Sequence, residues 1–580
     1  MPVTPTYPGV YIQEKPSGVH TIIGVATSIT AFVGRTQRGP VNAPTTINSY
    51  SDYERIFGGL DAESRTSYAV RDFYLNGGSQ AVIVRLYHGD SAHPEKSTAT
   101  VAVDTVKLQA ASWGKWGANL RLTVDTTNIL PAAATQLGVA ANKIFSITVQ
   151  DASPGGLTET FSNVTLVESS RRLDKVLVDS SRLVRWQDGQ PIGGAAAAPL
   201  TGGEKKSDNI SQKADAAIAA AKDWRDAAQA LAKAIADGKT GAALKPFTDD
   251  EAAKATARDG GQTALRAAIK SAVDAVTDAP LALEDYLPAK LAKSGLQSLE
   301  NVDLFNLLCL PPDTDGANGD ISSALWDAAA SYCEQRRAMV LVDPPASWSN
   351  KDLARQGIDA LMMRSRNAAL YFPRLLELDL LSENQELSFV PCGAIAGLFA
   401  RTDSERGVWK APAGIDAGVR GTSGLKVLVT DGENGELNPL AINCLRDFRF
   451  VGRVCWGSRT LRGADALTDE YKYVPVRRLA LYIEESLFRG TKWVVFEPND
   501  EPLWAQIRLN VGSFMNTLFR QGAFQGSTPK DAYLVKCDSE TTTQDDINKG
   551  VVNIIVGFAP LKPAEFVVIK IQQLTGKIPV

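Results

Sequence analysis

The sequence predicts a multidomain protein that combines α/β and α+β parts. Two segments, 21–90 and 301–465, alternate β-branched apolar runs with helical stretches, as buried parallel strands and their crossover helices do. Between them, Thr/Val/Ser-rich alternation in 91–200 indicates an antiparallel sheet with one wet face. The chain has 580 residues. That length accommodates roughly three to five folding units.

Composition and charge exclude several protein classes. The 61 basic and 65 acidic residues give a formal net charge of −4, and no Lys/Arg run stands out. Nucleic acid and anionic lipid are therefore poor candidate partners. No stretch reaches the ~20 consecutive apolar residues of a membrane helix, so we expect no direct membrane insertion. The start of the chain lacks the features of a secretory signal peptide, and we expect synthesis in the cytosol.

The first elements are an extended arm and the opening of an α/β layer. Residues 1–20 are rich in Pro and Gly around a short alternating run, which consists of Val10, Tyr11, Ile12, Gln13 and Glu14. In 21–90, apolar runs predict strands at 22–25, 31–33 and 81–84, and a helix is expected over 67–75.

An inserted outer domain is expected over 91–300. Its β-rich part includes predicted strands at 119–124 and 145–149. Residues 205–280 are Ala-rich and predict two or three helices, with breaks at Asp237-Gly238 and at Asp259-Gly260-Gly261. We favour an exposed insertion over a partner-specific coiled coil for this stretch.

The α/β pattern resumes at 301–465. Apolar runs predict buried strands at 305–310 and 338–342, and helices are expected over 321–335 and 352–363.

The last part, 466–580, predicts an α+β domain. A helix is expected over 474–489, a strand over 493–496 and a second helix over 502–521, whose exposed side carries Arg508 and Arg520. Strands are then predicted at 532–536, 552–558 and 565–571. The last of these lies in a carboxy-terminal arm, 563–580, and contains Phe566, Val567, Val568, Ile569, Lys570 and Ile571.

Some short segments resemble enzyme or ligand-binding motifs but lack residues that those motifs require. Asp72, His88 and Ser423 have the chain order of a subtilisin triad, but the residues flanking Asp72 and Ser423 do not complete the local patterns. A loop at Gly238-Lys239-Thr240 lacks the leading glycine and the preceding strand of a phosphate-binding loop.

Two candidate metal groups also fail. One contains Asp313, Asp315 and Asp320, and the other contains His88, Asp90 and His93; both are explained as well by ordinary turns or loops. The six cysteines form no CxxC pair and are expected to be reduced, buried thiols. We therefore predict no catalytic, cofactor or metal site.

A series of motifs runs through almost the whole chain. They are, in order, Tyr7-Pro8-Gly9-Val10-Tyr11-Ile12-Gln13-Glu14, Gly34-Arg35-Thr36-Gln37-Arg38-Gly39-Pro40, Trp116-Gly117-Ala118-Asn119-Leu120, Phe305-Asn306-Leu307-Leu308, Ala368-Ala369-Leu370-Tyr371-Phe372-Pro373, Trp409-Lys410-Ala411-Pro412-Ala413-Gly414, Val454-Cys455-Trp456-Gly457-Ser458-Arg459-Thr460-Leu461 and Pro563-Ala564-Glu565-Phe566. Together they resemble the motifs of contractile tail sheath proteins, found in phages, R-type bacteriocins and extracellular contractile injection systems. The Ala-rich segment departs from the pattern.

The resemblance implies a structural subunit rather than an enzyme. It implies a subtilisin-like α/β middle layer, outer domains inserted into it, and a carboxy-terminal domain that faces an inner tube. The implied partners are copies of the chain in six-fold helical rings, the tube protein, and baseplate and tail terminator proteins. The implied place of action is a virion tail or a released phage tail-like particle.

The terminal arms suggest how subunits are joined. Extended arms at both ends are suited to adding strands to a neighbour's sheet, although pairing within the same subunit is the alternative. Arg508 and Arg520 are candidate tube contacts, with a solvated helix face as the alternative. A hydrolase on the subtilisin-like core and a non-contractile shell protein remain competing functions.

Overall fold

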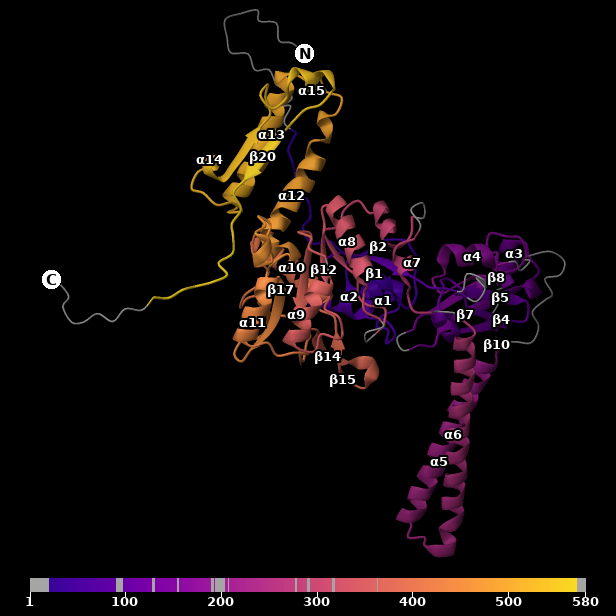
Figure 1. The fold of residues 1–580 in the computed structure, drawn as a ribbon. Coiled ribbons are helices and arrows are strands. Elements are labelled where there is room, and N and C mark those ends of the chain that lie inside the picture. Colours follow the sequence, from indigo (N-terminus) through magenta and orange to yellow (C-terminus); the bar gives the residue numbers. More distant parts are fainter. Residues whose placement is uncertain are drawn as a thin grey trace, which may run out of the picture.

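The computed structural model describes residues 20–89, 97–127, 131–153, 156–188, 192, 204–206, 208–276, 279–288, 293–314, 319–361 and 363–570. The predicted amino-terminal arm with its run from Val10 to Glu14 lies outside the described residues, as do Ile571, Asp90, His93 and Asp315. Figure 1 shows a central α/β body with a carboxy-terminal part at one end and an outer part, carrying a long helical hairpin, at its side.

The centre of the fold is an eight-stranded mixed sheet in the order β18-β17-β13-β12-β11-β1-β3-β2. Its strands are β1 (Thr30–Arg35), β2 (Thr45–Ile47), β3 (Ala81–Leu86), β11 (Leu307–Cys309), β12 (Met339–Val342), β13 (Ala368–Phe372), β17 (Ile442–Phe448) and β18 (Gly452–Cys455). The six inner strands pair in parallel, and the edge strands β2 and β18 are antiparallel to their neighbours. Because β1 pairs with β11, starting from Thr30 opposite Leu307, the two α/β segments form one sheet. The strands predicted around 31–33, 81–84, 305–310 and 338–342 are confirmed.

Helices cover both faces of this sheet. They are α1 (Tyr50–Phe57), α2 (Thr66–Leu75), α8 (Ser323–Gln335), α9 (Lys351–Ala360), α10 (Cys392–Arg406) and α11 (Asp431–Leu437). Alternate residues of β1 enter different cores: Val33 packs in one core with Trp326, and Phe32 packs in the other with Phe73. The period of two along a strand sends neighbouring side chains to opposite faces, so a fully apolar strand needs cover on both sides. A small sheet formed by β14 (Leu375–Asp379), β15 (Gln385–Phe389) and β16 (Gly424–Leu425) flanks this body.

The outer part contains two antiparallel sheets around a separate core. One sheet contains β4 (Thr100–Val103), β5 (Val106–Ala110) and β9 (Val184–Trp186); the other contains β6 (Leu120–Asp125), β7 (Ile144–Asp151), β8 (Thr158–Thr165) and β10 (Glu204–Lys206). Helices α3 (Pro131–Leu137) and α4 (Leu173–Ser180) accompany them, whereas α7 (Leu283–Tyr286) lies at the central body, where Tyr286 is buried in the same core as Val33. Along β6 buried and half-buried residues alternate, as predicted for a sheet with one face in the core.

The Ala-rich segment forms a hairpin of two long helices, α5 (Asp208–Ala236) and α6 (Lys245–Asp274), which projects away from the body in Figure 1. The predicted break at Asp237-Gly238 is confirmed, since α5 ends there and Gly238 has a left-handed φ of 75°. The predicted break at Asp259-Gly260-Gly261 is wrong, because α6 runs through it. A Cβ on Gly261 would lie 3.3 Å from the Cα of Ala217, so this glycine lets the two helices approach closely.

The carboxy-terminal part is built on two helices, α12 (Val474–Gly490) and α13 (Glu501–Arg520), with α14 (Pro529–Ala532), α15 (Gln544–Asn548) and the strands β19 (Tyr533–Lys536) and β20 (Ile555–Phe558). The predicted start of α13 is confirmed: the Asp500 side chain caps the helix by accepting from the Leu503 N–H at 3.2 Å. Trp504, Ile507 and Phe514 on α13 are buried in the core of this part.

Three predicted strands differ in the structure. The segment 493–496 is not a strand, because Lys492–Val494 form a 3₁₀ turn and the next residues are exposed without a neighbouring strand. Residues 22–25 are not a strand either; they lie along α12, where the Val25 N–H donates to the Ser486 hydroxyl. Residues 565–570 pair with no other strand of the described chain. In each case the apolar run lacks the adjacent strand that sheet formation requires.

No helix in the described ranges combines the length and the apolar character needed to cross a membrane.

Candidate functional site

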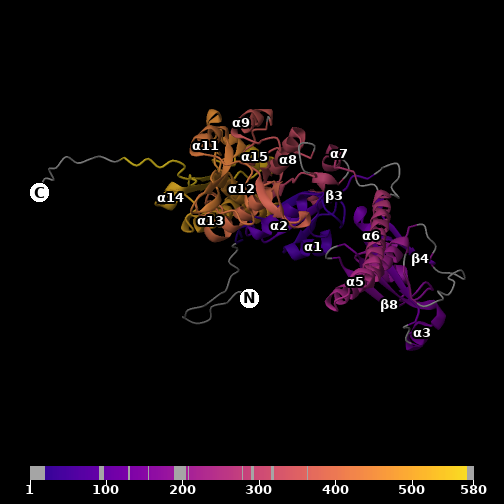
Figure 2. The same cartoon turned by 90° about the horizontal axis from the view of Figure 1, so that it is seen from below.

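The carboxy-terminal arm is the most exposed apolar segment of the described chain. After β20 the chain passes back to the central body and then runs away from it in an extended conformation, as Figure 1 and Figure 2 show. Phe566, Val567, Val568 and Ile569 are 74%, 81%, 79% and 79% exposed. These four consecutive apolar side chains are uncovered in their own subunit, and contiguous exposed apolar surface is typical of an interaction site.

One residue of the arm is firmly bound. The Glu565 carboxylate accepts from Arg459 Nε at 2.7 Å and from Arg459 Nη2 at 2.8 Å, from Asn438 Nδ2 at 2.7 Å and from the Tyr473 hydroxyl at 3.1 Å. Burial alone would raise the pKa of Glu565, but the hydrogen bonds from Arg459 and Asn438 outweigh it and the pKa is lowered. The arm is thus charged and docked at Glu565 and exposed from Phe566 onward.

Strands β19 and β20 form a separate small sheet. The two strands pair antiparallel, with Tyr533 opposite Phe558 and Lys536 opposite Ile555. Within the described chain no third strand joins this sheet, so each strand has an edge with open main-chain groups. Leu534 and Ile555 are 56% and 50% exposed.

The two predicted tube contacts lie at different places on α13. Arg508 donates to Glu501 Oε1 at 2.5 Å and to the carbonyl oxygen of Cys537, which turns its charge back toward its own domain. Arg520 is exposed near the end of the helix. The exposed residues between them, Leu509, Ser513 and Thr517, are uncharged.

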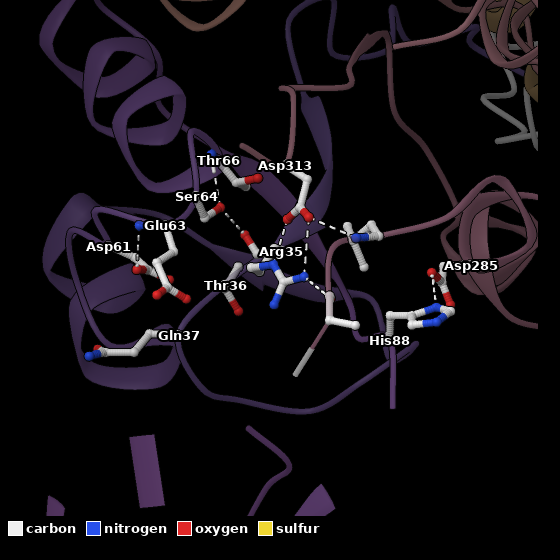
Figure 3. Close-up of polar contacts among 12 residues, drawn as sticks. Arg35, Thr36, Gln37, Asp61, Glu63, Ser64, Thr66, His88, Asp285 and Asp313 are labelled. Atoms are coloured by element: carbon white, nitrogen blue, oxygen red, sulfur yellow. Dashed lines mark hydrogen bonds and ion pairs between the residues drawn. The ribbon is translucent and has the colours of Figure 1, made fainter. Parts of the chain in front are cut away.

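The junction of the outer part with the central sheet is polar and buried (Figure 3). Arg35 at the end of β1 donates to both carboxylate oxygens of Asp313, at 2.5 and 3.1 Å, and to the carbonyl of Ala279. His88 Nδ1 lies 2.8 Å from Asp285 Oδ2. These contacts join the segments where the insertion leaves and re-enters the sheet.

The residues of the suggested triad have separate partners. Asp72 is ion-paired with Arg71 at 3.0 Å, His88 contacts Asp285, and the Ser423 hydroxyl donates to Glu386 Oε1 at 2.6 Å. The structure therefore does not bring them together as a nucleophile, base and orienting acid.

The described aspartates of the suggested Asp313/Asp315/Asp320 metal group likewise form ion pairs with other residues. Asp313 is held by Arg35, and Asp320 is ion-paired with Arg374. Within the described ranges no group of three His, Cys, Asp or Glu side chains is placed to hold a metal ion. All six cysteines are buried and unbridged.

The sequence of this chain is similar to those of known proteins. Residues 467–573, which contain α12, α13, β19, β20 and the first part of the arm, match the phage tail sheath C-terminal domain. The chain is related to contractile tail sheath proteins. The tail sheath protein of Vibrio phage KVP40 is 26% identical over 184 residues, which are 31% of this chain and 26% of that protein. The chain thus spans about a quarter of that relative's length.

Solved sheath structures share the fold over nearly the full length. The PVC sheath complex of an extracellular contractile injection system, in its contracted state, is 20% identical with a TM-score of 0.53, covering 99% of each chain. The sheath tail protein from Listeria innocua is 12% identical with a TM-score of 0.54, covering 93% of this chain and 96% of that one. The mixed α/β multidomain architecture is therefore that of sheath subunits.

Proposed function

We propose that this chain is a structural subunit of a contractile sheath, which polymerises with copies of itself as six-fold helical rings around an inner tube. The observation that carries the proposal is that one chain has both an exposed apolar arm and a two-stranded sheet to which no third described strand is added. An arm that buries no apolar surface in its own subunit and a sheet that lacks outer strands are complementary parts of one joint.

Strand addition explains the sequence of the arm. Main-chain hydrogen bonds join an added strand to the edge of β19 or β20 in a neighbouring subunit, and alternate side chains face the α13 side and the outer side. Phe566 and Val568 would then lie on one face, with Val567 and Ile569 on the other. The amino-terminal run from Val10 to Glu14 is proposed as the strand from a second neighbour.

The parts of the chain have different proposed roles. Residues 21–90 and 301–465 form the subtilisin-like middle layer, and 91–300 form the outer domain with the 205–280 hairpin on its surface. Residues 466–580 form the inner domain, which contacts the tube through the α13 face that ends at Arg520. Baseplate and terminator proteins complete the partners. The subunit is proposed to be synthesised in the bacterial cytoplasm and to act in a tail or tail-like particle without enzymatic activity.

Contraction requires that subunits move without separating. Strand pairs between subunits stay paired while the flexible segments beside them change direction, so the lattice can rearrange between two states. The exposed face of α13 is small and neutral apart from its end, which suits a contact that must be released when the sheath contracts.

The test is assembly of arm variants, observed by negative-stain electron microscopy with and without the tube protein. A Phe566→Ser/Val568→Ser variant is expected to remain as unassembled subunits. A Leu428→Ser variant serves as the matched control, since Leu428 is 69% exposed outside the arm. Normal cylinders from the arm variant would refute strand exchange, and a single lattice of constant width in every condition would favour a static shell.

A further inference from the structure

Glu565 is the one residue of the described arm for which side-chain hydrogen bonds to the rest of the chain are seen. Three side chains bind it, whereas Lys562, Ala564 and every described residue from Phe566 onward are exposed. The arm is therefore attached to its own subunit at a single point, and the apolar stretch that follows this point is uncovered.

The receptor for Glu565 is preorganised. Arg459 is 1% exposed, and its Nη1 donates to Asp465 Oδ1 and to the carbonyl of Asn438, both at 3.0 Å. The Arg459 N–H donates to Asn443 Oδ1 at 2.6 Å, which fixes its backbone beside β17. The guanidinium therefore presents its remaining Nε and Nη2 edge to Glu565 without rearrangement, and such a bidentate pair is directional as well as strong.

Two of the three residues that bind Glu565 lie in a different part of the molecule from the strand that precedes the arm. β20 belongs to the carboxy-terminal part, whereas Asn438 and Arg459 belong to the central body. Residues 561–565 cross between them and form one wall of a cavity of about 710 Å³, whose other walls include Trp409, Trp456 and Gln521. Residues 561–565, called the strap, thus carry the chain from the carboxy-terminal part to the central body, where the exposed part of the arm begins.

We propose that Glu565 is the positioning residue of strand exchange: clamped by Arg459, Asn438 and Tyr473 of its own subunit, it sets the point and direction from which residues 566 onward reach a neighbour. This inference rests on the proposed function. Fixing one end of a segment lowers the entropy that is lost when the rest of it binds, and it confines the segment to the volume where the acceptor lies.

The first test measures the clamp in isolated subunits. A spin label is placed on Ala564→Cys, an exposed position, and all native cysteines are buried. The label is expected to be immobile in the otherwise unchanged chain and to become as mobile as a label on Val568→Cys when Glu565→Gln is added. The matched control is Lys562→Gln, an exposed charge on the same strap, which should leave the spectrum unchanged. Equal mobility at positions 564 and 568 without Glu565→Gln overturns the clamp.

The second test measures its effect on assembly. Glu565→Gln is expected to slow polymerisation by about tenfold, the size expected for losing a charged hydrogen-bonded pair, while Lys562→Gln polymerises normally. Unchanged polymerisation of Glu565→Gln overturns the positioning role. A chain that ends after Glu565 keeps the clamp but lacks the strand: if it assembles normally, the proposed strand exchange itself is refuted, whatever the label at position 564 shows.

Discussion

Arg478 on α12 and Asp403 on α10 form a bidentate ion pair, with Nη1 to Oδ1 at 2.8 Å and Nη2 to Oδ2 at 2.6 Å. Both side chains are 4% exposed, and Arg478 Nη2 also donates to the carbonyl of Thr27 at 2.9 Å. The pair therefore joins a carboxy-terminal helix, a central helix and the segment that precedes β1.

Removing one charge of this pair is expected to destabilise the subunit strongly. Asp403→Asn leaves a buried guanidinium without its carboxylate, which should lower the free energy of unfolding by about 3 kcal/mol. Chemical denaturation measures the change. The control is Asp352→Asn, an exposed partner of Lys351, which should cost about 0.5 kcal/mol or less. Equal effects of the two substitutions would contradict the structural importance of the Arg478–Asp403 pair.

Adjacent glycines in α6 are expected to respond in opposite ways. Gly260 has open space around its missing Cβ, so Gly260→Ala should stabilise the helix by about 1 kcal/mol. Gly261 lies against Ala217, where a Cβ would be 3.3 Å from the neighbouring Cα. Gly261→Leu should therefore destabilise the hairpin by about 1 to 3 kcal/mol through overpacking. Thermal unfolding followed by circular dichroism distinguishes them; stabilisation by both would show that the helices do not touch at Gly261.

Asp343 should make the stability depend on pH. Its Oδ1 accepts from the Cys392 N–H at 2.9 Å, and burial raises the pKa of Asp343 to about 7 despite that hydrogen bond. Because the folded pKa lies above the unfolded value of about 3.9, stability falls as pH rises between these values and is level above about 7. Asp343→Asn removes the titration. The change in the free energy of unfolding that Asp343→Asn causes should be more favourable at about pH 8 than at about pH 5, by on the order of 2 kcal/mol.

The measurement is denaturant unfolding at both pH values. Asp327→Asn on the exposed side of α8 provides the control. A stability difference between Asp343→Asn and the unchanged chain that is the same at both pH values would contradict a titrating Asp343.

The Glu565 clamp should open in acid. Its folded pKa is lowered below the ordinary value of about 4.3. The docking contribution is therefore complete above that value and is lost as pH falls through the folded pKa. The label at position 564 should become mobile in that acidic range, whereas Glu565→Gln should be mobile at every pH. A spectrum that does not change with acid would contradict an ionised, docked Glu565.

The two arginines of α13 should contribute unequally to the proposed tube contact. Arg520 is exposed, whereas Arg508 is held by Glu501, so Arg520→Gln should reduce assembly on tubes more than Arg508→Gln does. Co-assembly yields at low and high salt measure both, since an exposed charge contact weakens with screening. Normal sheath length on tubes in the Arg508→Gln/Arg520→Gln double variant would show that neither charge contributes.

Local signals predicted most helices and buried strands of this chain. The capping Asp500 and the three- and four-residue spacing of Trp504, Ile507 and Phe514 located α13, because capping and periodicity are properties of one segment. The apolar runs around β1 and β3 located the central sheet for the same reason. The motifs that resemble those of sheath proteins are likewise local and run through almost the whole chain.

Contacts between distant segments decided the rest. The runs at 22–25 and 493–496 have the composition of strands but no neighbouring strand to pair with. The pair Gly260-Gly261 predicts a helix break, but in the structure Gly261 lies within α6 and packs against Ala217. Arg459 and Glu565 are 106 residues apart in the chain, and neither flanking sequence indicates the other.

The sequence by itself determined most of the helices and buried strands, that the chain has motifs resembling those of a sheath subunit, and that residues 566–569 are a run of apolar side chains. Only the tertiary structure decided which strands pair, which glycines touch a neighbouring helix, that Arg508 is turned back toward Glu501, and that the arm is clamped at Glu565. The physical reason is that periodicity and capping depend on neighbours along the chain, whereas ion pairs and close packing depend on where the fold brings remote residues together.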